Sequence, residues 1–414
     1  MENVASIGSG IEVEEIRKLF PILHQKINGH DLVYFDNAAT TQKPVQVLDA
    51  LQSYYTGYNA NIHRGIHTLA ERATTAFEQT RTTAASFLNA GSKEEIIFVR
   101  GVTEAINLVA SSYGRSKLQK GDEVILSGLE HHSNIVPWQL VAEEKQCHIK
   151  VIPVTDTGEL DLQAYRGLLN ERTRIVSVNH ASNSLGTINP VKEIIRLAHQ
   201  AGAVALIDGA QAAPHLPIDV QDLDCDFYCI SGHKMYGPTG VGVLYGKKKI
   251  LEAMPPYMGG GEMIRQVTFE KTTWNDLPYK FEAGTPNIAD VVALKSAFDF
   301  ISGTGKDAMA QHEHMLLRYA TERLSELNGL RVVGNSTNKV SVLSFVIEGI
   351  HPFDIGQMLD TRGIAVRTGH HCTQPLMDRM GLEGTVRASF AVYNTRKETD
   401  RLVEGLQRVI GFLK

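Results

Sequence analysis

The sequence predicts an α/β protein with a large domain built on a mostly parallel sheet and a smaller α+β domain. Between residues 96 and 245, short β-branched runs alternate with amphipathic segments, which is typical of a parallel sheet with helices on both faces. After Pro286 this alternation stops and two long helical segments begin. The length of 414 residues also exceeds the roughly 100–200 residues of one typical domain.

The large domain is predicted to contain seven strands in one sheet. These strands are expected at residues 96–100, 123–127, 149–154, 174–179, 204–208, 225–231 and 240–245. Helical patterns lie between most of them, at residues 103–117, 134–145, 161–170 and 191–201.

The C-terminal part has a different rhythm and predicts the smaller domain. Its expected helices cover residues 287–302, 307–327, 353–361 and 395–413. Its expected strands cover residues 331–333, 340–347, 364–367 and 385–390. We expect a large domain over residues 30–295 and a small domain formed by residues 1–29 and 296–414, with the boundary inside a long helix.

Composition excludes several classes of function. The chain has 41 basic and 46 acidic residues without a block of like charge, so no nucleic-acid partner is expected. No apolar run approaches the roughly 18 residues of a membrane span, so no membrane partner is expected either. Residues 1–10 lack a basic and an apolar region, which indicates a cytoplasmic protein without a leader. The sparse cysteines are expected to be free thiols, each more often a small buried residue than a reactive one: Cys147, Cys225, Cys229 and Cys372.

Common signatures of nucleotide binding and hydrolysis are absent from the sequence. Residues 305–307 (GKD) lack the Ser or Thr and the upstream glycine of a phosphate-binding loop, and no Gly-x-Gly-x-x-Gly joins a strand to a helix. There is no Gly-x-Ser-x-Gly elbow and no His-Glu-x-x-His helix. The simple NAD, ATP and hydrolase interpretations therefore lose their support.

A carboxylate and a lysine follow neighbouring predicted strands. Asp208 ends the strand at 204–208, and Lys234 follows the strand that ends at Ser231. Pyridoxal phosphate chemistry needs this pair, because the lysine holds the aldehyde as a Schiff base and the carboxylate keeps the pyridine nitrogen protonated. Taken alone, Asp208 could be a turn residue and Lys234 an exposed lysine.

Further residues could hold the phosphate and the ring of such a cofactor. Thr103 lies where a strand passes into a helix, and helix N-termini bind phosphate, although simple N-capping explains Thr103 equally well. Ser231 and His233 flank the lysine and could reach the same phosphate. His131 follows another strand, where its imidazole could stack on the pyridine ring.

A second group of chemically active residues lies in the C-terminal domain, at residues 367–372 (RTGHHC). A thiol beside histidines indicates a nucleophile or a metal ligand. Only Cys372 accompanies these histidines and no Cys-x-x-Cys pair exists, so no metal site is predicted. Arg387 could bind a substrate carboxylate through two hydrogen bonds, or form a surface salt bridge.

Taken together, these motifs resemble the class V, fold-type I pyridoxal-phosphate enzymes, in particular the SUF-type cysteine desulfurases, including members similar to selenocysteine lyase. The resemblance covers essentially the whole chain. It is carried, in order, by residues 34–40 (YFDNAAT), 63–67 (HRGIH), 130–134 (EHHSN), 208–211 (DGAQ), 231–234 (SGHK), 281–286 (FEAGTP) and 367–372.

The resemblance implies a role for each matching residue. Lys234 would bind pyridoxal 5'-phosphate covalently and move protons, Cys372 would carry the persulfide, and His131 would stack on the ring. Gln211 would contact the phenolic oxygen. The remaining cofactor ligands would be Asp208, Thr103, Ser231, His233 and, from the partner subunit of a homodimer, Thr285. The substrate L-cysteine would meet Arg387, Asn183, His370 and Arg367, with His63 and Arg64 near the mouth of the site.

Several alternatives remain open at this point. A selenocysteine lyase would use the same site without requiring Cys372, and another class V activity would act on a different substrate. A docking platform for sulfur-transfer proteins is a non-enzymatic alternative. The resemblance implies a sulfur acceptor of the SufE or the SufU type without selecting one.

Overall fold

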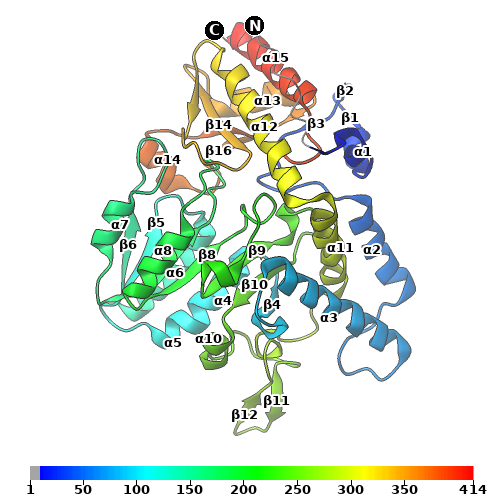
Figure 1. Ribbon diagram of the computed structural model, residues 1–414, viewed down its shortest axis with the longest axis vertical. Helices are drawn as coiled ribbons and strands as arrows, with labels where there is room; N and C mark the ends of the chain where they lie inside the picture. Colours follow the sequence, from blue (N-terminus) through cyan, green and yellow to red (C-terminus); the bar gives the residue numbers. More distant parts are fainter. Residues whose placement is uncertain (1–9, 414) are drawn as a thin grey trace.

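The computed structural model describes residues 10–413, and a seven-stranded sheet forms its centre (Figure 1). Within this sheet only β10 runs antiparallel to its neighbours. The prediction of a mostly parallel sheet is confirmed, and the ends of the expected strands differ from the observed ones by two residues at most. The spatial order is β4 (Ile96–Val99), β10 (Gly242–Gly246), β9 (Phe227–Ser231), β8 (Val204–Asp208), β7 (Thr173–Asn179), β5 (Glu123–Ser127) and β6 (His148–Ile152).

Both faces of this sheet are buried, because alternate residues of each strand point to opposite sides. On β4, Ile97 and Val99 pack in a core with residues of α4 and α6, whereas Ile96 and Phe98 pack with residues of α3, α8 and α11. The chain thus surrounds the sheet with helices, as its alternating pattern predicts. These helices are α4 (Val102–Val109), α6 (Val136–Lys145), α3 (Thr68–Leu88), α8 (Val191–Gln200) and α11 (Ile288–Thr304).

Some elements differ from the expectation or were not expected. The helix expected at residues 103–117 is interrupted by one π-helical turn, Ala110–Gly114, between α4 and α5. The helices α2 and α3 and the hairpin β11–β12, which projects from the large domain in Figure 1, had no counterpart in the prediction. The remaining elements of this part are α1 (Val13–Lys18), β1 (Lys26–Ile27), β2 (His30–Asp31), β3 (Val33–Tyr34), α2 (Val45–Gly57), α5 (Arg115–Lys117), α7 (Leu162–Leu168), α9 (Val220–Leu223), α10 (Lys248–Ala253), β11 (Ile264–Val267) and β12 (Thr272–Trp274).

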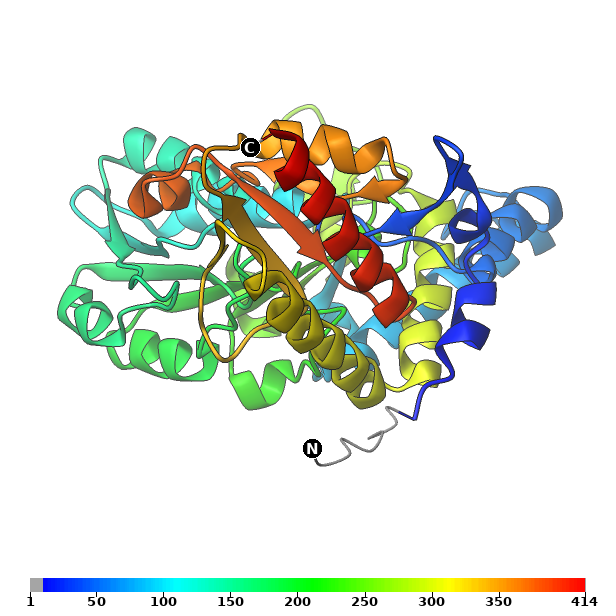
Figure 2. The same cartoon turned by 90° about the horizontal axis from the view of Figure 1, so that it is seen from above.

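The C-terminal part is built on a four-stranded antiparallel sheet in the order β13–β14–β17–β16. Helices α12 and α15 contact each other and lie across this sheet (Figure 2). The elements are α12 (Lys306–Ser325), β13 (Leu330–Val333), β14 (Val342–Ile347), α13 (Pro352–Asp360), β15 (Ile364–Ala365), β16 (Arg367–Gly369), α14 (Gln374–Met380), β17 (Thr385–Ser389) and α15 (Arg396–Leu413).

The expectation of a single strand at residues 364–367 is wrong. The backbone first pairs in parallel with β3 through β15 and then leaves it to pair with β17 through β16. The segment therefore forms two short strands, because its first part pairs with β3 and its second part pairs with β17. This exchange matters for the site, because β16 leads directly into the loop that carries Cys372.

The large and the small sheet each have a hydrophobic core, and the residues in these cores show where the chain passes from one to the other. Phe298 and Ile301 of α11 pack in the core of the large sheet, whereas Leu316 of α12 belongs to the core of the small sheet. Val33 and Phe35 also pack in that second core. The domain boundaries at residues 30 and 295 stay a prediction. Residues 1–9 lie outside the described residues, so the prediction made from residues 1–10 that the protein lacks a leader falls mostly outside them too.

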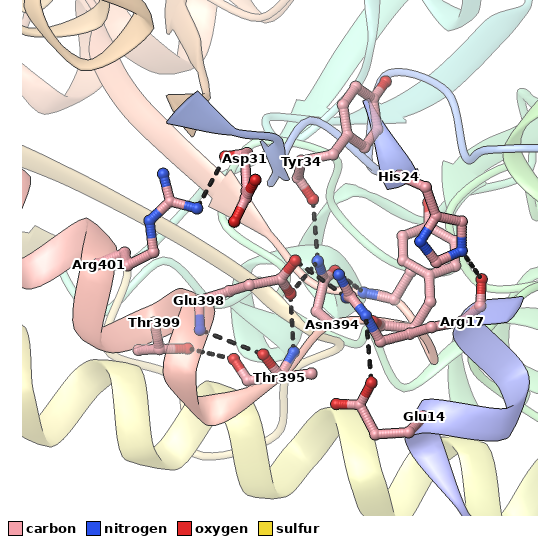
Figure 3. A network of polar contacts seen from close by, with 12 residues as sticks. Glu14, Arg17, His24, Asp31, Tyr34, Asn394, Thr395, Glu398, Thr399 and Arg401 are labelled. Atoms are coloured by element: carbon pink, nitrogen blue, oxygen red, sulfur yellow. Dashed lines mark hydrogen bonds and ion pairs between the residues drawn. The ribbon is translucent and has the colours of Figure 1, made fainter. Parts of the chain in front are cut away.

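The N-terminal segment is tied to the C-terminal helix by a polar network (Figure 3). Arg17 forms an ion pair with Glu398 at 2.9 Å. Asn394 Nδ2 donates to the carbonyl oxygen of Tyr34 at 3.0 Å, and Arg401 donates to the carbonyl oxygen of Asp31 at 2.7 Å. These contacts hold β3 beside the small domain. No helix within residues 10–413 has the length and apolarity needed to cross a membrane.

Candidate active site

A cavity of about 500 Å³ lies where the strands of the large sheet end and the small domain covers them. Strand ends supply its floor, because the carboxyl ends of neighbouring parallel strands meet at one edge. The small domain supplies residues 367–372 and Arg387. The cavity brings together most of the predicted site residues: Thr103, His131, Asn183, Asp208, Gln211, Ser231, His233, Lys234, Arg367, His370, Cys372 and Arg387.

Asp208 and Lys234 form the charged centre of the cavity. Burial raises the pKa of Asp208, while the N–H of Ala210, which donates to Oδ1 at 2.9 Å, and the charge of Lys234 lower it. Burial lowers the pKa of Lys234, and the charge of Asp208 offsets part of this effect. A lysine amine with a lowered pKa is a better nucleophile and a better proton acceptor near neutral pH.

The N-terminus of α4 opens onto the same cavity. Gly101 precedes α4 with φ +150. A Cβ at this position would lie only 3.3 Å from Ser231 Oγ, so a glycine lets the backbone come close to Ser231. Ser231 Oγ accepts the N–H of Val102 at 2.9 Å. Burial and the nearby Lys234 lower the pKa of His233 to about 4, so its ring is neutral. Hydroxyl groups and a positive helix end are suited to a phosphate.

His131 lines the cavity as a neutral ring. Burial, followed by the charge of Lys234, lowers its pKa to about 3. Its Nδ1 accepts the backbone N–H of Ser133 at 3.1 Å, so the hydrogen of the neutral ring is on Nε2. Behind it, the buried Glu130 accepts from Asn134 Nδ2 at 2.7 Å and from the backbone N–H of Asn179 at 2.9 Å. This network holds the segment that presents the ring.

Cys372 lies exposed on a strained loop between β16 and α14. His371 and Cys372 both have positive φ values, 51 and 56, which side chains rarely adopt. Four free thiols were expected and are found in the described residues, with Cys225 and Cys229 buried and Cys147 partly buried. Cys372 is the exposed one, which differs from the small buried residue that a cysteine more often is.

The two arginines share one carboxylate. Arg367 Nη2 lies 2.7 Å from Asp36 Oδ2, and Arg387 Nη2 lies 3.4 Å from Asp36 Oδ1. Arg387 is buried, which lowers its pKa to about 10. Asn183 Nδ2 donates to the carbonyl oxygen of His371 at 2.8 Å, so its amide holds the loop as well as lining the cavity. Within residues 10–413, Arg387 Nε is buried and has no hydrogen-bond partner.

Three predicted residues do not line this cavity. Thr285 is exposed, with Oγ1 3.5 Å from Asn61 Nδ2. His63 Nε2 lies 3.1 Å from Glu78 Oε1, and Arg64 forms an ion pair at 3.1 Å with Glu262. The resemblance assigns Thr285 to the site of a partner subunit, and that role stays a prediction.

The residues present fit pyridoxal 5'-phosphate. The described part of the chain leaves Gln211 Oε1 buried without a hydrogen-bond partner, and the Gln211 side chain lines the cavity, where a polar group of a bound ligand would satisfy it. The α4 end suits the phosphate, Lys234 suits the aldehyde and Asp208 suits a protonated ring nitrogen. No three His, Cys, Asp or Glu side chains of residues 10–413 gather as metal ligands.

A family model described as aminotransferase class-V matches residues 33–402. The chain belongs to this family. It is therefore a pyridoxal-phosphate-dependent protein of fold type I, as the resemblance implied.

Individual relatives agree with this assignment. The chain is 53% identical over 400 residues to a cysteine desulfurase of Synechococcus elongatus, covering 97% of this chain but only 64% of that protein. It is 52% identical over 398 residues to a cysteine desulfurase of Dickeya dadantii, covering 96% of both chains. The crystal structure of the cysteine desulfurase CsdA from Escherichia coli is similar with a TM-score of 0.91 and 40% identity, covering 98% of this chain and 100% of that one.

Sequence reasoning missed the roles of Asp36 and Glu130. Both lie in motifs that carry the family resemblance, two and three residues after the strands β3 and β5, but neither carboxyl group was considered as part of the site. Asp36 pairs with the arginines and Glu130 supports the His131 segment. The signal was a carboxyl group in the loop that follows a strand, similar to that of Asp208, which is the last residue of β8.

Proposed function

We propose that this protein is a SUF-type cysteine desulfurase, which converts L-cysteine to L-alanine and keeps the sulfur as a persulfide on Cys372. The observation that carries the proposal is one cavity lined by Lys234, Asp208 and an exposed thiol. The names of the relatives in Synechococcus and Dickeya support the same activity. In this reaction the C–S bond of cysteine breaks, an S–S bond forms at Cys372, and the β-carbon gains a proton.

The bound pyridoxal phosphate supplies an electron sink that makes the bonds at the substrate Cα and Cβ labile. Lys234 holds the cofactor and then serves as the proton carrier at Cα, which the lowered pKa of its amine favours. Asp208, buried beneath the cavity, keeps a proton on the ring nitrogen. His131 stacks on the ring as a neutral imidazole whose Nε2–H can donate a hydrogen bond.

The arginines select the substrate by its carboxylate. Arg387 Nε is buried and has no partner among the described residues, so a carboxylate there would satisfy it. Asp36 neutralises part of the charge of Arg387 and of the more exposed Arg367, which lowers the cost of burying the Arg387 guanidinium beside a second positive charge. His370, whose Nδ1 accepts the backbone N–H of Cys372 at 3.1 Å, is the proposed acceptor of the Cys372 proton.

The wider setting is part of the same proposal. We infer a cytoplasmic homodimer in which Thr285, His63 and Arg64 approach the site of the partner subunit. The sulfur passes to an acceptor of the SufE or SufU type. The exposure of Cys372 supports such a transfer, because an acceptor thiol must reach the persulfide.

An anaerobic assay with L-cysteine tests the function. Alanine and sulfide are measured for the wild type, Cys372→Ala and the control Cys147→Ala, which removes the partly buried thiol outside the cavity. We expect alanine from the wild type and the control, and its loss from Cys372→Ala. Unchanged alanine production by Cys372→Ala would refute the persulfide, and activity of that variant on L-selenocysteine alone would indicate a lyase.

A further inference from the structure

Two neighbouring histidines face two parts of the site. His131 lines the cavity, and its ring centroid lies 6.3 Å from that of His132. The next residue, His132, contacts the thiol loop instead. The backbone N–H of His132 donates to the carbonyl oxygen of Cys372 at 2.8 Å. One short segment of the large domain therefore contacts both the cofactor cavity and the loop of the small domain.

The ring of His132 also contacts the start of helix α14. The first N–H groups of a helix have no partner within the helix and need one from outside. Thr373, which precedes α14, makes no side-chain capping bond. Instead, the backbone N–H of Gln374 donates to His132 Nε2 at 3.1 Å. His132 thus caps a helix that lies 242 positions away in the sequence.

The loop needs such ties because its backbone is strained at residues 371 and 372. Asn183 holds the carbonyl of His371 at 2.8 Å, and Ser184 Oγ lies 2.6 Å from Thr373 Oγ1. Within the loop, the backbone N–H of Cys372 donates to His370 Nδ1 at 3.1 Å. The bonds that reach Cys372 and Gln374 from outside the loop both come from His132. His132 therefore ties the large domain to the loop at two points, the carbonyl oxygen of Cys372 and the N–H of Gln374.

We propose that His132 is a positioning residue that anchors the Cys372 loop through its backbone N–H and its ring Nε2. Because His131 is its neighbour, this anchor holds the thiol at a set distance from the ring that stacks on the cofactor. The importance of that distance rests on the proposed function, but the anchoring itself does not.

The electrostatic surroundings support an accepting ring. Nε2 can accept a hydrogen bond from Gln374 only when it carries no proton. Burial, and then the neighbouring ring of His370 at 5.7 Å between centroids, lower the pKa of His132. The ring is therefore an acceptor at neutral pH.

The test compares His132→Met with His132→Gln in the cofactor-loaded protein. The two side chains have similar length, but only glutamine offers an oxygen near the position of Nε2. Two rates are measured: alkylation of Cys372 by iodoacetamide, and amide hydrogen exchange in peptides covering residues 370–376. Neither rate requires turnover, so their outcome is independent of the proposed activity.

We expect both rates to rise about fivefold in His132→Met, as for the loss of one hydrogen bond, and to stay within about twofold of wild type in His132→Gln. Alkylation of Cys147 serves as the internal control and should not change. Equal rates in all three proteins, or equal increases in both variants, would overturn the proposal. If His132→Met does not fold, His132→Asn replaces it, because the asparagine side chain is too short to bring its oxygen to the N–H of Gln374.

Discussion

Arg81 offers a quantitative test of how the site region is held together. Its side chain is fully buried on α3, and its two Nη atoms lie 2.7 and 2.9 Å from the carboxylate oxygens of Glu282. It also donates to the carbonyl oxygen of Ile96 at 2.8 Å and pairs with Glu78 at 3.2 Å. This one side chain therefore joins α3, β4 and the segment that leads to Thr285.

Removing the guanidinium leaves the carboxylate of Glu282 buried without its main counter-charge. Breaking a buried ion pair in this way costs about 3–5 kcal/mol, so Arg81→Met is expected to lower the free energy of unfolding by about 4 kcal/mol. Glu282→Gln keeps an oxygen that can accept the N–H of Phe98, now at 2.8 Å, and should cost about 2 kcal/mol. In the double variant the uncompensated charge is gone, and we expect about 2 kcal/mol less than the sum of the single losses.

The assay is urea unfolding of the cofactor-loaded protein, followed by circular dichroism at one fixed protein concentration. Fixed concentrations of protein and cofactor are needed because ligand binding and association shift the apparent stability. Arg81→Lys, which keeps the charge but cannot form two parallel bonds, is the matched control and should lie between wild type and Arg81→Met. Losses that add within about 0.5 kcal/mol would refute the reasoning, because independent sites behave in that way.

Two further predictions concern pH. For Glu78, burial raises the pKa, but hydrogen bonds from His63 and the charge of Arg81 outweigh it and hold the pKa at about 2. Its ionised form therefore stabilises the fold above its ordinary pKa of 4.5, and this stability is lost as the pH falls toward 2. Glu78→Gln should flatten the acid side of the melting temperature against pH, and an unchanged slope would contradict this. Burial raises the pKa of Glu130 to about 8, so its stabilising effect is lost as the pH rises from 4.5 through 8. Glu130→Gln should therefore gain in melting temperature relative to wild type across that range, and a constant difference would contradict the assignment.

The strands of the large domain could be predicted because they are short runs rich in β-branched residues, and most of them are separated by helical patterns. The long helix α3 could not be predicted in the same way. Its buried face includes Thr80 and Arg81 beside several alanines, so its hydrophobic period is weak. Burying Arg81 is favourable only because Glu282 and Glu78 pair with it. Hydrophobic periodicity cannot predict these pairs, because Glu282 lies far away in the sequence.

The C-terminal strand assignment failed for a related reason. One strand was predicted over residues 364–367, but which partner each residue pairs with depends on where β3 and β17 lie. The contact between His132 and the thiol loop has the same origin. Nothing in residues 130–134 indicates which distant helix the ring of His132 caps.

The sequence by itself determined the chemistry of the site and its position at the ends of the strands, because parallel strands must bring Asp208 and the Lys234 segment to one edge. Tertiary structure decided which groups are buried together and therefore which charges they carry. His131 is neutral because it is buried near Lys234, and Arg387 is paired because Asp36 packs beside it. Burial and neighbours set protonation and hydrogen bonding, and both depend on contacts between segments that are far apart in the chain.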